Sequence, residues 1–425
     1  MQTPRPSIPR FVSDLRFINL IFGLVWLLSL RYLLTKSYYD PSSFFFRRDD
    51  AYEPIYSAVR EQEADNFISS IQSSDSDQGQ GLRKIHGSAG EKAPFCLGIP
   101  SLQREQSQFL PRTLASLVDF LDPDERELLH IVVLLSDDNA ATNSAFGQKW
   151  LHTIADTVLV HEDTADLPVV KSHYHKIPRL PPKTDRSEHM RQDFAKLLET
   201  CRQLNTEYFI LVEDDVIASR DWFRRLRRVL PEVNSQAYSK SKDWLYLRLF
   251  YSETYMGWNS EEWPIYIKYI ALVYVATIAV LFGLRQLYHL VPVFSKERLY
   301  KTSRLLPANI LIIWLPMFIG LYFMAGRLTV QPLTPGVHEM PQYGCCSQGL
   351  VLPRRHMQMI EATLISNPYD LPGDSSIETL AEEKDLAKWA IVPSVLQHTG
   401  IRGSSAKGAA RKWTWNFNFE RVYTR

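Results

Sequence analysis

The sequence is poor in cysteine and has no excess of charge of either sign. Its 425 residues include four cysteines, and 48 basic side chains balance 47 acidic ones, for a formal net charge of +1. Cys96, Cys201, Cys345 and Cys346 are too few and too scattered for a disulfide scaffold or a zinc site, although one or two disulfides remain open. Adjacent Cys345 and Cys346 would be strained if bonded to each other. The charge balance gives no general attraction to nucleic acid, so no nucleic-acid partner is expected.

The N-terminal segment also lacks the small residues of a signal-peptide cleavage site. Residues 1–16 are basic. Residues 17–34 form a mostly apolar run in which Arg31 is the only charged residue, and a long side chain can snorkel from that position. We therefore expect a cytoplasmic tail at 1–16 and an uncleaved transmembrane helix at 17–34. A cleaved signal peptide is the alternative. Residues 35–91 are predicted to form a lumenal stem that ends in a mobile loop rich in Ser, Asp, Gln and Gly.

Long apolar runs, in contrast, are abundant. Residues 265–284 and 308–325 are each close to the roughly 20 residues that a helix needs to cross a bilayer. The connector at 285–307 is basic, which places it in the cytoplasm by the positive-inside rule. We predict three spans in a lipid bilayer, with the soluble parts at 92–264 and 326–425 on the lumenal side. The alternative is a pair of buried helices in a large soluble protein.

The soluble parts show strands that alternate with helices. Predicted strands lie at 95–99, 131–135, 157–160 and 208–212, and predicted helices at 109–121, 144–153 and 186–204. After the hairpin, a strand at 344–352, helices at 355–365 and 376–389, and an apolar run at 391–398 continue the pattern. This order predicts an α/β fold with a mostly parallel mixed sheet and helices on both faces. Ligands of such sheets gather at the carboxyl ends of the strands. The hairpin is expected to interrupt one domain.

Three carboxylates stand directly after the predicted strand at 208–212. Glu213, Asp214 and Asp215 would repel one another unless a cation or a solvated turn relieves the repulsion. A hard divalent metal prefers oxygen ligands and can bridge to substrate phosphates. The alternative is an acidic turn after an ordinary core strand. The position at the carboxyl end of a buried strand favours the metal site.

Several motifs occur in an order that resembles a known family. They are Gly98-Ile99-Pro100-Ser101 with Arg104-Glu105, Glu213-Asp214-Asp215, residues 247–253 with Gly257-Trp258, and Gln397-His398-Thr399-Gly400 with Ser404-Ser405. The set resembles GT-A-fold glycosyltransferases related to N-acetylglucosaminyltransferase IV. With the inserted hairpin, the chain is similar to the post-GPI-attachment GalNAc transferase family of the Golgi, from the first membrane helix to about residue 405.

The resemblance implies a metal-dependent, inverting transferase. A UDP-sugar would be the donor, Mn²⁺ the metal, and GPI-anchored proteins or the GPI glycolipid the acceptor, in the Golgi membrane. Donor-binding residues would be Pro100, Glu213, Asp214 and Asp215, with Asp215 and His398 as metal ligands. A hydrogen-bonded structural histidine is the other interpretation of His398.

An inverting enzyme needs a carboxylate that takes the proton of the acceptor hydroxyl. Asp374, which follows Pro372-Gly373 and precedes a helix, is the candidate catalytic base. Glu253 and Glu378 are rivals, and helix capping is the alternative role for Asp374.

Three further features have simpler interpretations. The basic run that includes Arg224, Arg225, Arg227 and Arg228 could contact anionic lipid or the anchor's phosphates, but a solvated helix face is favoured. His173 and His175 are expected in a loop. The segment at 412–415 could stack on sugar or lie on the membrane, and a packed terminal strand is preferred.

Overall fold

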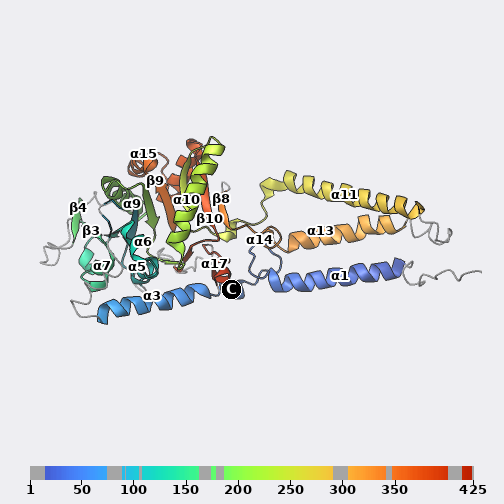
Figure 1. Cartoon of the computed structure of the whole chain (residues 1–425), viewed down its shortest axis with the longest axis horizontal. Coiled ribbons are helices and arrows are strands. Elements are labelled where there is room, and N and C mark those ends of the chain that lie inside the picture. The colour runs from blue at the N-terminus through green and yellow to red at the C-terminus, as the bar shows by residue number, and fades with distance from the viewer. Residues whose placement is uncertain are drawn as a thin grey trace, which may run out of the picture. The chain divides into compact units, whose positions relative to one another are not determined.

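The computed structural model describes residues 15–73, 89–90, 92–104, 108–161, 174–178, 186–290, 305–340, 347–400 and 414–423. The chain divides into two compact units. The first comprises Met1–Glu53 and Met256–Pro332, and the second comprises Pro54–Tyr255 and Leu333–Arg425. The second unit is thus assembled from two segments on either side of the hairpin in the sequence (Figure 1).

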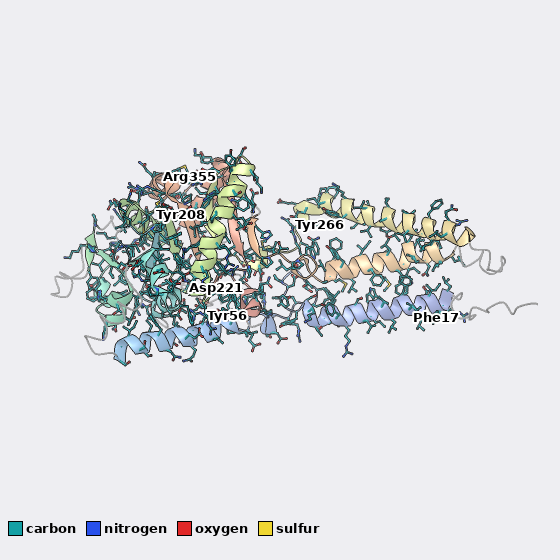
Figure 2. All side chains as sticks on the ribbon, viewed as in Figure 1. Phe17, Tyr56, Tyr208, Asp221, Tyr266 and Arg355 are labelled. Carbon is teal, nitrogen blue, oxygen red and sulfur yellow. A yellow bond between two sulfur atoms is a disulfide. The ribbon has the colours of Figure 1, made fainter. Side chains whose placement is uncertain are left out.

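Three helices among the described residues are long and apolar enough to cross a membrane, and they lie almost wholly in the first unit. The candidate spans are Leu15–Lys36 (α1), Glu253–Leu287, which includes most of α11 (Trp263–Leu290), and Leu305–Met324, which ends in α13 (Leu315–Met324). Almost none of their side chains are buried, and they project along the whole length of each helix (Figure 2). Apolar side chains in such numbers are stable outside the protein core only in lipid.

Helix α1 packs against the third span through aromatic side chains. Trp26 donates to the carbonyl of Met317 (3.2 Å), and the indole of Trp314 donates to Asn19 Oδ1 (2.8 Å). Trp314 lies in a π-helical turn, η4 (Ile310–Trp314), that precedes α13. These indole hydrogen bonds satisfy polar groups that lipid could not.

The described residues of the second unit form a central sheet of nine strands, in the order β4-β3-β2-β1-β5-β9-β7-β10-β8. Strands β9 and β8 run against the others, so the sheet is mostly parallel as predicted. The bounds are β1 Phe95–Ser101, β2 Leu129–Leu135, β3 Thr157–His161, β4 His175–Ile177, β5 Tyr208–Val212, β7 Trp244–Arg248, β8 Gly336–Glu339, β9 Gly349–Pro353 and β10 Ala387–Val392. A separate antiparallel pair joins β6 (Val216–Ala218) to β11 (Leu396–His398).

Helices cover both faces of this sheet, which confirms the prediction. Successive side chains of a strand point to opposite faces, and in β5 Ile210 and Val212 belong to one core while Phe209 and Leu211 belong to the other. The first core includes α3 (Tyr56–Ser73), α5 (Leu110–Val118), α7 (Lys149–Ile154) and α10 (Trp222–Ser239). The second includes α9 (Arg186–Gln203), α15 (Arg354–Ser366) and α16 (Gly373–Glu383).

One disulfide crosses the second core. Cys96 of β1 is bonded to Cys201 of α9, whose Phe194, Leu197 and Leu198 form the apolar stripe that faces the sheet. The sequence left this pairing open. Cys345 and Cys346 lie outside the described residues.

The structure corrects several predicted elements. The helix expected at 144–153 is only α7, after a short 3-10 turn at Ala140–Thr142. The helix expected at 376–389 ends at Glu383, because Asp385 takes a left-handed conformation (φ 50°) and the following residues pair with β7 and β8 as β10. The strand predicted at 208–212 is the fifth strand and not the fourth, because the three-residue β4 precedes it. Strand β4 includes His175, which was expected in a loop. His173 lies outside the described residues.

Two surface features also differ from expectation. Within the described residues 414–423 the chain forms a turn and the short helix α17 (Phe419–Val422), so the expected terminal strand is wrong; Lys412 and Trp413 lie outside them. In the basic run of α10, Arg224, Arg227 and Arg228 are exposed as predicted. Arg225 differs, because it contacts the Tyr423 hydroxyl and donates to the carbonyl of Pro393 (2.7 Å).

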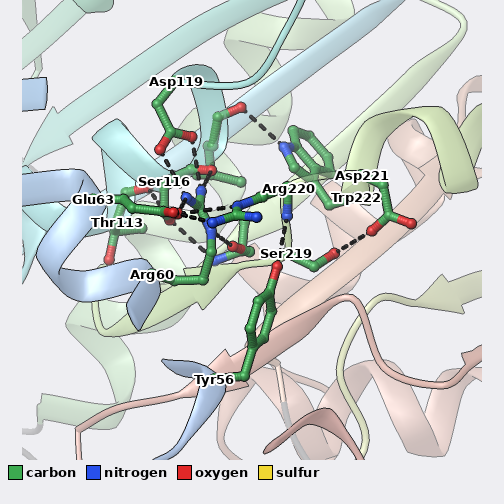
Figure 3. A network of polar contacts seen from close by, with 12 residues as sticks. Tyr56, Arg60, Glu63, Thr113, Ser116, Asp119, Ser219, Arg220, Asp221 and Trp222 are labelled. Carbon is green, nitrogen blue, oxygen red and sulfur yellow. Dashed lines mark hydrogen bonds and ion pairs between the residues drawn. The ribbon is translucent and has the colours of Figure 1, made fainter. Parts of the chain in front are cut away.

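Helix α3, in the predicted stem, belongs to the second unit, and a buried arginine joins it to the rest of that unit (Figure 3). Arg60 is fully buried and forms a two-pronged ion pair with Asp119 (2.8 and 2.9 Å). It also donates to the carbonyls of Ser116 (3.0 Å) and Ala218 (2.9 Å) and contacts Glu63. Because Ala218 belongs to β6, this network supports the strand that directly follows the acidic motif.

Candidate active site

The acidic motif lies at the carboxyl end of β5, the central strand of the sheet. Strand β5 pairs in parallel with β1 and in antiparallel with β9, and its residues from Phe209 to Val212 are buried. Asp214 and Asp215 are also buried, each 4% exposed. A solvated acidic turn would leave these carboxylates in water, so the burial argues against that alternative.

Donors from neighbouring elements hold two of the carboxylates. The hydroxyl of Ser347, which shortly precedes β9, donates to Glu213. Asp214 accepts hydrogen bonds from Ser101 Oγ at the end of β1 (2.9 Å) and from the guanidinium Nη2 of Arg104 (2.6 Å). Both carboxylates are therefore anchored by segments that the sheet brings to the same edge.

The small β6–β11 sheet places His398 beside the third carboxylate. His398 pairs with Val216, the residue after Asp215, and its Nε2 lies 3.4 Å from Asp215 Oδ2. The backbone N–H of Thr399 donates to the carbonyl of Asp215 (2.8 Å). A Cβ at Gly400 would lie 2.3 Å from Asp215 Oδ2, so only glycine permits this close approach.

Burial and mutual repulsion separate the pKa values of the three acids. Burial and the charge of Asp215 raise the pKa of Glu213 to about 7, and burial raises that of Asp214 to about 7 against the pull of Arg104. For Asp215 burial acts in the same direction, but the charges of His398 and Arg104 outweigh it and lower the pKa to about 2. Burial lowers the pKa of His398, and Asp215 overcomes this and raises it. Asp215 and His398 thus form a buried ion pair.

The donor atoms at Asp215 and His398 fit a divalent metal with two protein ligands. Asp215 Oδ1 is buried and has no hydrogen-bond partner among the described residues. His398 Nδ1 lies 2.9 Å from Thr414 Oγ1, so an N–H can stay there when a metal displaces the Nε2 proton of the ion pair and takes the Nε2 lone pair. A carboxylate suits Mn²⁺ or Mg²⁺, and an imidazole is an ordinary ligand of divalent transition metals. No group of three or more His, Cys, Asp or Glu side chains in the described part of the chain could hold a metal ion, so further ligands would come from substrate and water.

Asp374 lies in the first turn of α16 and is half-buried. After burial and the charge of Asp215, the charge of Asp374 makes a smaller contribution to the raised pKa of Glu213. One Asp374 oxygen accepts from the N–H of Ser375 (2.8 Å). The rivals are held elsewhere: Glu378 contacts Tyr246, Arg248 and Lys388, and Glu253 accepts from both nitrogens of Asn418.

Sequence reasoning named part of this site and missed the rest. Pro100 lies in β1, one residue before Ser101, whose hydroxyl bonds Asp214. Ser101 and Arg104 were noted only as part of a motif, and Ser347 and Thr414 carried no signal, because a lone hydroxyl in a loop has no periodicity. Glu105, Ser404 and Ser405 lie outside the described residues.

A further acid, half-buried, lies at the same edge of the sheet. Asp193 of α9 lies 3.9 Å from Nε2 of His161, the last residue of β3, and close to Ser136 and Asp137 after β2. Burial and the charge of Asp137 raise the pKa of Asp193 to about 7. Strongly shifted carboxyl groups at this edge are typical of functional sites. The sequence gave no signal for Asp193.

The shift at Asp193 predicts a pH-dependent stability. A carboxyl whose pKa is raised by folding stabilises the protein while protonated, so this contribution is lost as pH rises from about 4 through 7. Asp193→Asn should therefore match wild type near pH 4 and exceed its stability at pH 8, by roughly 4 kcal/mol at most, at 1.4 kcal/mol per pH unit between the two pKa values. Thermal unfolding of the detergent-solubilised chain across this pH range measures the difference.

Asp243→Asn provides a control of opposite sign. Burial opposes ionisation of Asp243, but its bonds to Arg355 outweigh burial and lower its pKa to about 2. This variant should lose stability at neutral pH, and the difference should vanish as pH falls through 4 toward 2. A constant difference between Asp193→Asn and wild type from pH 4 to 8 would contradict the assignment.

A family model described as GPI-N-acetylgalactosamine transferase PGAP4 matches residues 95–397 of the chain. The match covers well over half of the 425 residues and includes the acidic motif and Gln397. The chain belongs to this family. The resemblance seen in the sequence is thereby confirmed, and with it the general class of the protein, a glycosyltransferase family.

Curated relatives with more distant sequences agree. The chain is 23% identical over 193 residues to the alpha-1,3-mannosyl-glycoprotein 4-beta-N-acetylglucosaminyltransferase B of Danio rerio, covering 42% of this chain and 32% of the relative. The chain is 27% identical over 158 residues to the protein of the same name from Homo sapiens, which covers 36% of this chain and 27% of the relative. It is 24% identical over 204 residues to the alpha-1,6-mannosyl-glycoprotein 4-beta-N-acetylglucosaminyltransferase of Gallus gallus, which covers 44% of this chain and 42% of the relative. The chain spans less than half the length of these relatives.

Proposed function

We propose that the protein transfers a sugar, GalNAc, from a UDP-sugar to the glycan of GPI anchors in the Golgi lumen. The observation that carries this proposal is the convergence of Glu213, Asp214, Asp215 and His398 at the carboxyl end of β5, in a chain of the PGAP4 family. This arrangement supports a GT-A-type donor site. The choice of GalNAc and of the GPI acceptor rests on the family description.

In this mechanism Asp215 and His398 would hold Mn²⁺, which supplies positive charge to the diphosphate as it leaves. Ser101 and Arg104 hold Asp214, and Ser347 holds Glu213. These hydrogen bonds fix the positions of both carboxyl groups beside Asp215. Pro100 precedes Ser101 on β1, where it would border the donor.

Asp374 is the proposed catalytic base. Its carboxylate would take the proton of an acceptor hydroxyl while that oxygen bonds to the anomeric carbon and the bond from this carbon to the UDP oxygen breaks, which inverts the anomeric centre. Two observations support Asp374 over its rivals. It is half-exposed at the start of α16, whereas Glu253 is fully buried and Glu378 is held by two cations, Arg248 and Lys388.

The three candidate spans support a membrane-bound enzyme with a cytoplasmic N-terminus and a lumenal catalytic unit. The Cys96–Cys201 disulfide favours an oxidising compartment for that unit. A GPI acceptor is tethered to the bilayer by its own lipid. An enzyme anchored by helices in the same membrane shares that layer with the acceptor, which limits their relative orientation.

The proposal is tested by incubating the purified chain with Mn²⁺, a panel of UDP-sugars and a GPI glycolipid acceptor. UDP-GalNAc should be the preferred donor, and EDTA should abolish transfer. The relatives' names favour one second candidate, transfer of N-acetylglucosamine to protein-linked glycans. A clear preference for UDP-GlcNAc would overturn the GalNAc assignment, and absence of UDP binding would indicate a non-catalytic membrane scaffold.

A further inference from the structure

The side chain of Arg104 occupies the space between two carboxylates of the acidic motif. Its Nη2 lies 2.6 Å from Asp214 Oδ1 and 3.2 Å from Asp215 Oδ2. The guanidinium carbon lies 4.9 Å from the ring centroid of Phe109, and the side chain is only 17% exposed. Arg104 is therefore fixed in place by a salt-bridged nitrogen on one side and an aromatic ring on the other.

Among the described residues, only Nη2 of its three nitrogens has a hydrogen-bond partner. Nε and Nη1 are buried, and neither has a hydrogen-bond partner in the described part of the chain. Leaving a buried donor unpaired is unfavourable, so native sites with such donors usually bind a ligand or water there. An anion with several oxygens is the natural partner for the unused edge of a guanidinium.

Next to these unused donors lies an unused acceptor. Asp215 Oδ1 is buried and also lacks a partner among the residues that the structure describes. The unused donors of Arg104 can thus bind an anion, and the unused oxygen of Asp215 can bind a cation. The two side chains are adjacent, with 3.2 Å between Arg104 Nη2 and Asp215 Oδ2. A divalent cation bound to a diphosphate presents both charges side by side, and neither a free metal nor a free sugar does so.

We propose that Arg104 binds the diphosphate of the nucleotide donor through Nε and Nη1 while Nη2 remains on Asp214. This inference rests on the proposed function, because it takes a nucleoside diphosphate as the ligand. Arg104 is then a donor-binding residue in addition to a partner of the acidic motif. It would compensate phosphate charge even before a metal is bound, and stabilise the departing diphosphate in the transition state.

The test measures binding by isothermal titration calorimetry with the full chain in detergent micelles, with UDP, uridine and Mn²⁺ as separate probes. In Arg104→Gln the Kd for UDP in EDTA should rise about 10- to 100-fold, as expected for losing hydrogen bonds to a charged group. The Kd for uridine should stay within about twofold, because uridine has no phosphate. The affinity for Mn²⁺ alone should be unchanged or higher, since a positive charge beside Asp214 and Asp215 has been removed.

The different changes expected in the affinities for UDP and for Mn²⁺ distinguish a role of Arg104 in binding from a role in folding. A merely structural arginine would weaken UDP and Mn²⁺ binding together, and that result would overturn the inference. An unchanged Kd for UDP would also overturn it. Arg104→Lys keeps the charge but not the planar fork, so an intermediate loss is expected.

Arg112→Gln is the matched control. This arginine follows Arg104 closely in the sequence and lies on α5, where it pairs with Asp65 and Glu61 of α3 at 43% exposure. Its Kd for UDP should equal that of wild type. If wild type binds no UDP even with Mn²⁺ present, the proposed function fails and this inference with it. If wild type binds UDP and Arg104→Gln binds it equally well, or if wild type binds UDP only with Mn²⁺, the inference alone is rejected.

Discussion

Asp215→Asn is expected to lower sugar transfer by on the order of 1,000-fold, the size of loss seen when one preorganised charge in a transition state is removed. Asp215 is the one acid of the motif that stays ionised well below neutral pH, with a pKa of about 2, and it lies 3.4 Å from His398. Asparagine keeps the shape and removes the charge. The measurement is kcat/KM for the preferred UDP-sugar at saturating Mn²⁺, together with Mn²⁺ binding followed by electron paramagnetic resonance.

Two variants make this result specific. Asp214→Asn should lose less activity, because Asp214 already accepts from Ser101 and Arg104 and has no unused oxygen of the kind found at Asp215. Asp65→Asn, on the exposed surface of α3, should be as active as wild type. If Asp215→Asn kept a tenth or more of wild-type activity with normal Mn²⁺ affinity, Asp215 would not be the metal ligand.

Arg60→Met is expected to destabilise the second unit by about 3–5 kcal/mol, which corresponds to a fall in Tm of roughly 10 °C. The guanidinium is fully buried, and its loss would leave the carboxylate of Asp119 buried without a charge partner. The carbonyls of Ser116 and Ala218 would lose their donor as well. Thermal unfolding of the solubilised chain measures the effect.

Arg112→Met is the control for this prediction. Both arginines join α3 to α5, but Arg112 is 43% exposed, and exposed ion pairs contribute only about 0–1 kcal/mol. The double variant Arg60→Met/Asp119→Leu should recover much of the loss, because an apolar pair leaves no buried charge behind. Equal destabilisation by Arg60→Met and Arg112→Met would show that burial of the Arg60 pair is not what stabilises α3.

The periodic segments were the most predictable part of this fold. The strands at β1, β2, β3 and β5 and the helix α9 agree with the sequence pattern to within two residues, because each has a clear apolar run or stripe. The failures are elements whose conformation depends on partners. Trp389 was expected in a helix, yet it pairs with Leu247 of β7 and Glu339 of β8. The residues of β4 were too few to show a pattern, and hydrogen bonds to β3 define that strand.

The sequence alone determined which segments are long and apolar enough to cross a membrane and which three carboxylates stand together after a buried strand. Length and apolar character suffice for a membrane span, and Glu213, Asp214 and Asp215 stand together in the chain. Tertiary structure alone decided what joins them. His398 reaches Asp215 only because β11 pairs with β6, and Arg104 reaches both aspartates only because β1 lies beside β5. Such contacts join residues more than 100 positions apart, and no local pattern in the sequence records a pairing at that separation.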